Sequence, residues 1–202
     1  NRHNLHLEIA KFSRGWTATK ADLIITPSNH LKNVVKGWGV KENSIKVIYN
    51  GTKLKNKPDP IDDQPNDYFK FITVGRLAPW KNIDIIIEAL SDYKKANQNF
   101  IFYIVGSGPE EIKLKKLVND LDLENFVTFT GQLQKDDLNY YLQKSDIYIQ
   151  ASSYEGLPHV ILEAMSHNLS IISTPIGGTN EVIQDGKNLS LIHISEPTRR
   201  YR

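Results

Sequence analysis

The chain of 202 residues has a formal net charge of +2, with 40% hydrophobic and 24% charged residues, which is ordinary for a globular protein with an apolar core. Nucleic-acid-binding domains usually carry a strong basic surplus, so this balance argues against that class. The absence of cysteine excludes disulfides and thiolate metal sites and fits a cytosolic protein, and no apolar run is long enough to span a bilayer.

The first part of the chain predicts a short α/β piece followed by a linker. Residues 21–26 (ADLIIT) predict a buried strand, with a helix near 28–38 and a second strand at 45–48. The next residues are rich in Asn, Pro, Asp and Lys, with a turn at Asn50-Gly51. We interpret 1–49 as the end of a preceding Rossmann-like domain and 50–67 as an interdomain linker.

From residue 68 the sequence alternates between strand and helix patterns. Strands are predicted at 68–74, 100–105, 127–130, 147–150 and 170–173. Helices are predicted at 82–95, near 114–121, at 136–144 and at 157–167. Because the strands are apolar on both faces, we expect a parallel sheet with helices on both sides, a Rossmann-like domain over 68–188. Residues 189–202 do not continue the alternation, and we interpret them as a tail that is not native to the domain.

The loops after these strands should meet at one edge, because ligands bind outside the carboxyl ends of parallel strands. The loop GRLAPWKN, at 75–82, places Arg76 and Lys81 beside the start of a helix, where backbone N–H groups already favour an anion. This pattern makes a diphosphate site a candidate, and a solvated basic loop is the alternative. The loop GSGPEE, at 106–111, is interpreted as a tight turn whose acids, Glu110 and Glu111, cap the next helix and repel phosphate.

The stretch ASSYEGLPHVILEAM, at 151–165, carries two carboxylates around a helix start. Glu155 precedes Gly156, where a backbone without a side chain lets a ligand approach closely, and Glu163 lies two turns further on. A carboxylate only accepts hydrogen bonds and can hold two adjacent hydroxyls. The alternatives are helix capping for Glu155 and a surface position for Glu163, and spacing alone does not choose between these readings.

Five stretches together resemble glycosyltransferase family 4, whose members are retaining, nucleotide-sugar-dependent enzymes of the two-domain GT-B fold. They are VGRLAPWKNID, IVGSGPEE, VTFTGQL, ASSYEGLPHVILEAM and STPIGGTNEVI, and they occur in the family's order. The resemblance runs from about residue 21 to 188 and identifies the chain as the C-terminal, donor-binding portion of such an enzyme.

The resemblance implies roles for individual residues. Arg76, Lys81 and Glu155 would be catalytic: the two cations stabilise the leaving diphosphate, and Glu155 holds hydroxyls of the transferred sugar. Glu163 would hold the ribose hydroxyls, and backbone amides near two glycine turns would face the donor. The full implied donor-binding set is Gly75, Arg76, Lys81, Glu155, Gly156, Leu157, Glu163, Gly177, Gly178 and Thr179. The expectation is that the enzyme needs neither metal nor cofactor, the nucleotide-diphosphate sugar being its donor substrate.

The resemblance also implies a reaction and its partners. A sugar would pass with retention of configuration to an acceptor hydroxyl, on a saccharide or a lipid-linked acceptor, with no nucleic acid involved. The enzyme would be cytoplasmic, and would associate with the inner face of the membrane if its acceptor is a lipid. These residues alone are expected to be inactive, because the acceptor-binding half is not among them. A sugar-nucleotide epimerase of GT-B architecture and a non-catalytic nucleotide-sugar-binding module are the alternatives.

Overall fold

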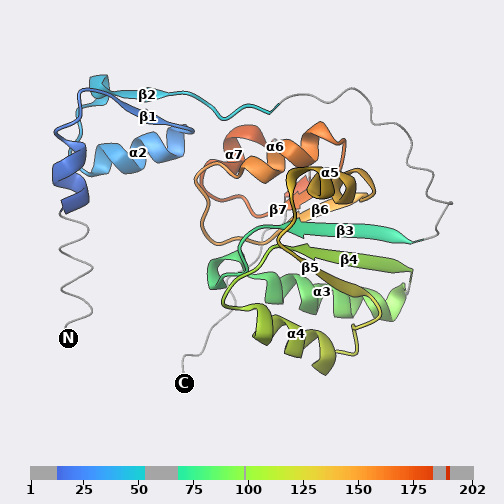
Figure 1. The fold of residues 1–202 in the computed structure, drawn as a ribbon. Helices are drawn as coiled ribbons and strands as arrows, with labels where there is room; N and C mark the ends of the chain where they lie inside the picture. The colour runs from blue at the N-terminus through green and yellow to red at the C-terminus, as the bar shows by residue number, and fades with distance from the viewer. Residues whose placement is uncertain (1–12, 53–67, 98, 184–189, 192–202) are drawn as a thin grey trace, which may run out of the picture.

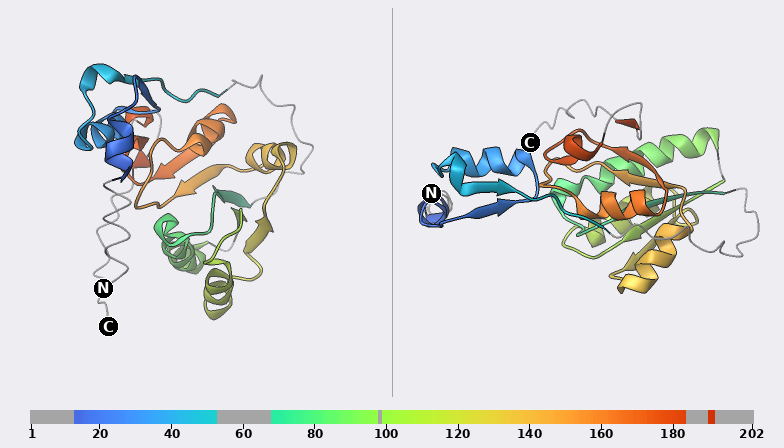
Figure 2. Two further views of the ribbon diagram at one scale, coloured as in Figure 1. Left: turned by 60° about the vertical axis from the view of Figure 1, so that its left-hand side comes forward. Right: turned by 90° about the horizontal axis from the view of Figure 1, so that it is seen from above.

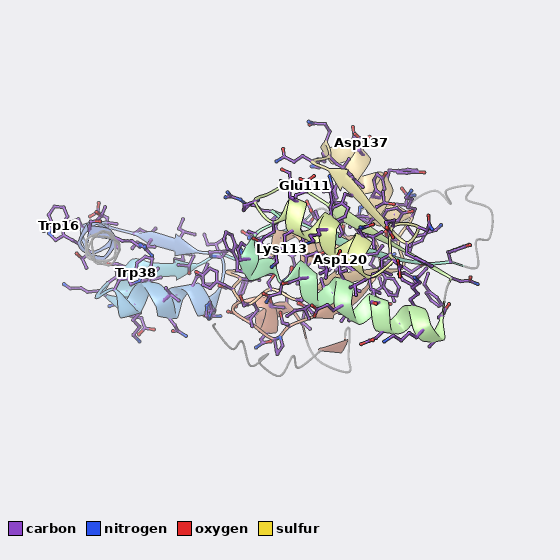
Figure 3. The ribbon with its side chains drawn as sticks, turned by 90° about the horizontal axis from the view of Figure 1, so that it is seen from below. Trp16, Trp38, Glu111, Lys113, Asp120 and Asp137 are labelled. Atoms are coloured by element: carbon purple, nitrogen blue, oxygen red, sulfur yellow. The ribbon has the colours of Figure 1, made fainter. Side chains whose placement is uncertain are left out.

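The computed structural model describes residues 13–52, 68–97, 99–183 and 190–191. Residues 13–52, here called the N-terminal segment, form a two-stranded parallel sheet of β1 (Ile24–Thr26) and β2 (Ile45–Val47), connected through α2 (Asn29–Gly37) and the 3₁₀ turn η1 (Glu42–Ser44). A small core of Val35, Val40 and Ile45 holds it together. Trp16 and Trp38 lie on this segment, which forms one end of the molecule (Figure 3).

The second sheet contains six parallel strands in the order β5-β4-β3-β6-β7-β8 (Figure 1). Their bounds are β3 (Phe69–Val74), β4 (Phe100–Val105), β5 (Val127–Gly131), β6 (Ile147–Gln150), β7 (Ser170–Ser173) and β8 (Ser190–Leu191). The chain adds strands on one side of β3 up to β5, and then returns to place β6 on its other side. This reversal between β3 and β6 is where open parallel sheets bind ligands.

Helices cover both faces of this sheet (Figure 2). On one face α3 (Ile83–Ala96) and α4 (Glu111–Asp120) pack against strand side chains such as Phe71 and Phe102. On the other face α5 (Lys135–Gln143) and α6 (His159–Ser166) pack against the alternate residues, among them Ile72 and Tyr148. The short α7 (Thr179–Val182) follows β7 and ends at Ile183, which is buried in the same cluster.

The predicted α/β fold with a parallel sheet between helices is confirmed, and the five predicted strands of the second domain occur within one residue or so of the expected bounds. Besides short 3₁₀ turns, one helix and one strand were not expected. These are α7, and β8, which pairs with β7 inside the stretch interpreted as a tail. Residues 53–67 of the predicted linker and 192–202 of the tail lie outside the described residues.

Candidate functional site

The loop after β3 is fixed to the loop after β6 at the point where the strand order reverses. Asn82, in a left-handed conformation (φ 48°), donates from Nδ2 to the Ala151 carbonyl at 2.9 Å. The Ser153 amide donates to the Trp80 carbonyl at 2.8 Å. These two bonds bracket the 3₁₀ turn η2 (Pro79–Lys81) and therefore bring Lys81 to the β6–α6 loop, residues 151–158.

Lys81 and Glu155 form an ion pair across these loops. Lys81 Nζ lies 2.6 Å from Glu155 Oε1, and the two side chains are only 18% and 13% exposed. The end of the lysine side chain lies over Gly75, where an added Cβ would sit 3.3 Å from Lys81 Cε. Three of the predicted residues thus meet at one place, although in sequence they are up to 80 positions apart. The capping alternative for Glu155 is wrong, because the N-cap of α6 is Pro158 and the Glu155 carboxylate binds Lys81 instead.

Arg76 follows Gly75 in the chain and is exposed to solvent. It lines a cavity of about 630 Å³ at the carboxyl ends of β3 and β4, together with Gly106, Ser107, Gly108 and residues at the start of α5. Within the described part of the chain, Arg76 pairs with no carboxylate. The two predicted cations therefore differ: the Lys81 charge is neutralised by Glu155, whereas the Arg76 charge is open to a ligand.

The turn at 106–108 packs on the loop after β3. A side chain at Gly106, where φ is +129°, would overlap the Gly75 carbonyl oxygen, and the Leu77 amide donates to the Ser107 carbonyl at 2.9 Å. The predicted tight turn is observed, because the Glu111 amide donates to the Gly108 carbonyl at 3.2 Å. Glu111 lies in the first turn of α4 as expected, but no side-chain capping bond is formed. The N-cap residue Glu110 makes no side-chain capping bond to α4 and pairs with Lys113 at 3.1 Å instead.

Glu163 lies on α6 with its side chain 29% exposed, and its Oε1 is 3.6 Å from His159 Nδ1. In the described residues no direct bond joins Glu163 to Glu155, yet the charges of both carboxylates influence the pKa of the buried Tyr148. Burial, and then the charges of Glu155 and Glu163, raise the pKa of Tyr148. The Tyr148 hydroxyl donates to Gln150 Oε1 at 3.0 Å. Nothing in the sequence singles out Tyr148, which is only a tyrosine within an apolar strand.

The second glycine turn, at Gly177 and Gly178, packs on the backbone of the β6–α6 loop. Gly177 has φ +55°, and a side chain there would overlap the Glu155 carbonyl oxygen. The Gly178 amide donates to the Gly156 carbonyl at 2.8 Å, and the Thr179 amide to the Ile176 carbonyl at 3.0 Å. Two of the amides expected to face the donor thus already have acceptors in this structure.

The remaining features of the predicted donor-binding residues are their backbone amides and the burial of Leu157 and Thr179. Across the described residues, no acceptor is seen for the amides of Gly156, Leu157 or Gly177. The Leu157 side chain is 7% exposed and Thr179 is fully buried, so neither side chain reaches a ligand from the surface.

Two further features bear on the chemistry. No group of three or more His, Cys, Asp or Glu that could hold a metal ion occurs among the residues described. Within the same residues, no helix is long and apolar enough to cross a membrane.

Comparison with known proteins gives consistent matches. The family model described as "Glycosyl transferases group 1" matches residues 55–199. An uncharacterized glycosyltransferase of Methanocaldococcus jannaschii is 32% identical over 186 residues, covering 88% of this chain and 47% of the relative. The GPI3 subunit of phosphatidylinositol N-acetylglucosaminyltransferase from Saccharomyces cerevisiae is 29% identical over 175 residues, covering 83% of this chain and 39% of the relative. The chain thus spans about half the length, or less, of these curated relatives.

Among solved structures, HepE of Anabaena in complex with UDP and glucose is similar with a TM-score of 0.78 and 26% identity, over 89% of this chain and 53% of that one. The same protein in complex with UDP-glucose gives a TM-score of 0.77 and 27% identity, over 87% of this chain and 51% of that one.

Proposed function

The chain belongs to the family of group 1 glycosyl transferases, and from this premise we propose that it binds a nucleotide-diphosphate sugar whose sugar is transferred, with retention, to an acceptor hydroxyl. Within that family we place it in glycosyltransferase family 4. The observation that carries the proposal is the Lys81–Glu155 ion pair over Gly75, beside the exposed Arg76, at the point where the strand order reverses. One cation is open to an anion here, and a second is held by a carboxylate suited to hydroxyl groups.

When the donor binds, Lys81 and Glu155 each exchange the other for a group on the donor. The diphosphate displaces the Glu155 carboxylate from Lys81, and the exposed Arg76, next to Gly75, binds the diphosphate as well. The released Glu155 carboxylate then accepts hydrogen bonds from hydroxyls of the donor's sugar. Both halves of the ion pair thus find new partners on the same ligand, so the exchange leaves neither charge unpaired in the partly buried loop.

The same residues assist the reaction. As the bond between the sugar and the diphosphate breaks, negative charge grows on the leaving phosphate, and Lys81 and Arg76 oppose it. Preorganised contacts of this kind each contribute about 10²–10³ in rate. The acceptor hydroxyl attacks the oxocarbenium-like sugar on the face that the diphosphate leaves and gives its proton to the leaving phosphate, which retains the configuration. Glu163 holds the ribose, and no metal or cofactor is required.

The donor we propose is a UDP-sugar, because HepE of Anabaena, similar in structure, is solved with UDP and with UDP-glucose. Its base and ribose lie against the cavity of about 630 Å³ beside Arg76, which is within the usual size range of small-molecule sites. The acceptor is a saccharide or a lipid-linked molecule. For a lipid acceptor the protein works in the cytoplasm at the inner face of the membrane.

Thermal shift with UDP-, GDP- and ADP-sugars tests donor binding with this chain. At 100 times its Kd, a ligand that binds only the folded state adds about 2.7 kcal/mol, which raises Tm by roughly 5–10 °C for a chain of this size. We expect this shift for a UDP-sugar, and a much smaller one in the Lys81→Ala variant. The Glu88→Gln variant, which changes an exposed charge on α3, is the matched control. The absence of any shift with all three donor classes would refute donor binding.

Turnover is measured in the full-length protein, because the residues at hand supply the donor side and we propose that they bind the donor without transferring its sugar. Transfer to an acceptor supports the glycosyltransferase. Isomerisation of the donor in the absence of acceptor would identify an epimerase instead, and tight binding without consumption would identify a binding module.

A further inference from the structure

Glu181, on α7, holds the N-terminal segment by its carboxylate. Oε2 accepts hydrogen bonds from the Asn29 amide at 2.8 Å, from the Tyr49 hydroxyl at 2.9 Å and from Asn29 Nδ2 at 3.1 Å. Oε1 accepts one from the His30 amide at 2.7 Å. Asn29 and His30 are the first residues of α2, where backbone N–H groups lack acceptors within the helix and a negative charge is stabilised. A carboxylate from one part of the chain thus occupies the helix start of another part, more than 150 residues away.

The protonation state of Glu181 fits this arrangement. Burial by itself would raise the pKa of Glu181, but the hydrogen bonds donated by His30, Asn29 and Tyr49 outweigh burial and lower it. The same contact raises the pKa of Tyr49, whose hydroxyl is held as a donor. Glu181 is therefore ionised at neutral pH, and all four hydrogen bonds are charge-assisted.

The start of α2 also contacts the β6–α6 loop directly. Ser28, the N-cap of α2, accepts from the Leu31 amide at 3.1 Å and donates to the Gly156 carbonyl at 3.2 Å. That carbonyl also accepts from the Gly178 amide. The Leu31 side chain packs so close to Gly156 that an added Cβ would lie 2.8 Å from Leu31 Cδ1. Gly156 is therefore held from both sides, by α2 and by the turn that leads into α7.

We propose that Glu181 is a positioning residue that couples the N-terminal segment to the sugar end of the donor site, an inference that rests on the function proposed above. The Glu181 carboxylate keeps the start of α2 in place, and Ser28 and Leu31 then hold Gly156. Gly156 follows Glu155, the carboxylate assigned to the donor's sugar. Arg76 and the cavity at 106–108 are not in this chain of contacts. Loss of the Glu181 charge therefore weakens the sugar end of the site and spares the nucleotide end.

Amide hydrogen exchange followed by NMR tests the coupling without any ligand. Glu181→Gln keeps the side-chain size and removes the charge. We expect exchange at the Gly178 amide, whose acceptor is the Gly156 carbonyl, to become about tenfold faster, the size of effect expected from a lost helix-capping carboxylate. Exchange within α4 should stay within about twofold, because general destabilisation would speed both. Tyr49→Phe, which removes a single donor, should shift exchange in the same direction by a smaller factor, and Glu88→Gln is the control.

Isothermal titration calorimetry with UDP-glucose and with UDP then measures how the substitution changes the affinity for each ligand. Glu181→Gln should raise the Kd of UDP-glucose about tenfold and the Kd of UDP less than threefold. Equal weakening of both ligands, or faster exchange confined to the start of α2 with Gly178 unchanged, would overturn the coupling. If the unmodified chain does not bind UDP-glucose, the proposed donor is refuted, while the exchange measurements still decide whether Glu181 orders the loop.

Discussion

Neutralising Glu155 should make the site bind free UDP more tightly, although Glu155 is assigned to the active site. In the unliganded structure Lys81 Nζ is held 2.6 Å from Glu155 Oε1, so a diphosphate has to displace the carboxylate before it gains the cation. Glu155→Gln keeps the shape of the side chain and removes its charge. UDP has no sugar that could bind Glu155. In Glu155→Gln its diphosphate therefore gains the unpaired Lys81 and loses no hydrogen bond between a sugar and the carboxylate.

The size of the gain follows from the geometry of the pair. Two full charges at this distance attract by about 6 kcal/mol with an effective dielectric constant of 20. Most of this attraction is offset by desolvation, and exposed pairs contribute only about 0–1 kcal/mol net. At 18% and 13% exposure the pair is better shielded than an exposed one. We therefore take about 1.4 kcal/mol, which corresponds to a tenfold lower Kd for UDP.

Isothermal titration calorimetry of UDP into the unmodified chain, Glu155→Gln and the Glu88→Gln control measures this difference. UDP-glucose is titrated in parallel, and its affinity should gain less than that of UDP, because its sugar loses an acceptor. High salt should reduce the difference for UDP, since both the ion pair and the diphosphate contact are screened. A Kd for UDP that is unchanged within twofold, or higher, in Glu155→Gln would show that the diphosphate does not compete with Glu155 for Lys81.

Three further predictions concern single residues. Lys81→Ala should lower kcat of the full-length protein by about 10²–10³ with the fold retained, and near-normal turnover would remove Lys81 from the mechanism. Glu163→Ala should raise the Kd of the donor about tenfold through the ribose, and an unchanged Kd in calorimetry would count against that role. Gly177→Ala should cost about 2–4 kcal/mol in urea unfolding, because a Cβ would overlap the Glu155 carbonyl oxygen at φ +55°. Gly37→Ala, in open space at the end of α2, is its control and should not destabilise the chain.

Five strands of the main sheet could be predicted because they are short runs rich in apolar and β-branched residues, most clearly FIFYIV before Gly106. The elements that were missed lack such a local pattern. α7 is four residues long, too short to show a helical period. β8 is two residues long and is defined by its pairing with Ile172 and Ser173 of β7, a non-local contact that no composition rule detects.

For the site, the sequence was sufficient to predict which loops lie close together, but not how their side chains pair. Topology alone brings the loops after β3 and β6 to one edge, and so brings Lys81 near Glu155. That the two side chains pair depends on the left-handed conformation of Asn82 and on its bond to the Ala151 carbonyl, which spacing in the sequence does not reveal. Tyr148 was missed for a similar reason, since its burial, and the effect of the Glu155 and Glu163 charges on its pKa, arise only once α6 packs on β6.

The part of the site that the sequence could least predict is the backbone of Gly156. Its glycine was expected to admit a ligand, and the structure adds a second demand, because the end of the Leu31 side chain would have to move to admit a side chain there. The Gly156 carbonyl accepts from Gly178 in the same domain and from Ser28, which precedes it by 128 residues. A contact of that sequence separation forms only once both parts of the chain are folded. The loop that carries Glu155 is therefore ordered partly by the N-terminal segment. On the proposed function, a shift of that segment should weaken binding of the donor's sugar more than binding of its nucleotide.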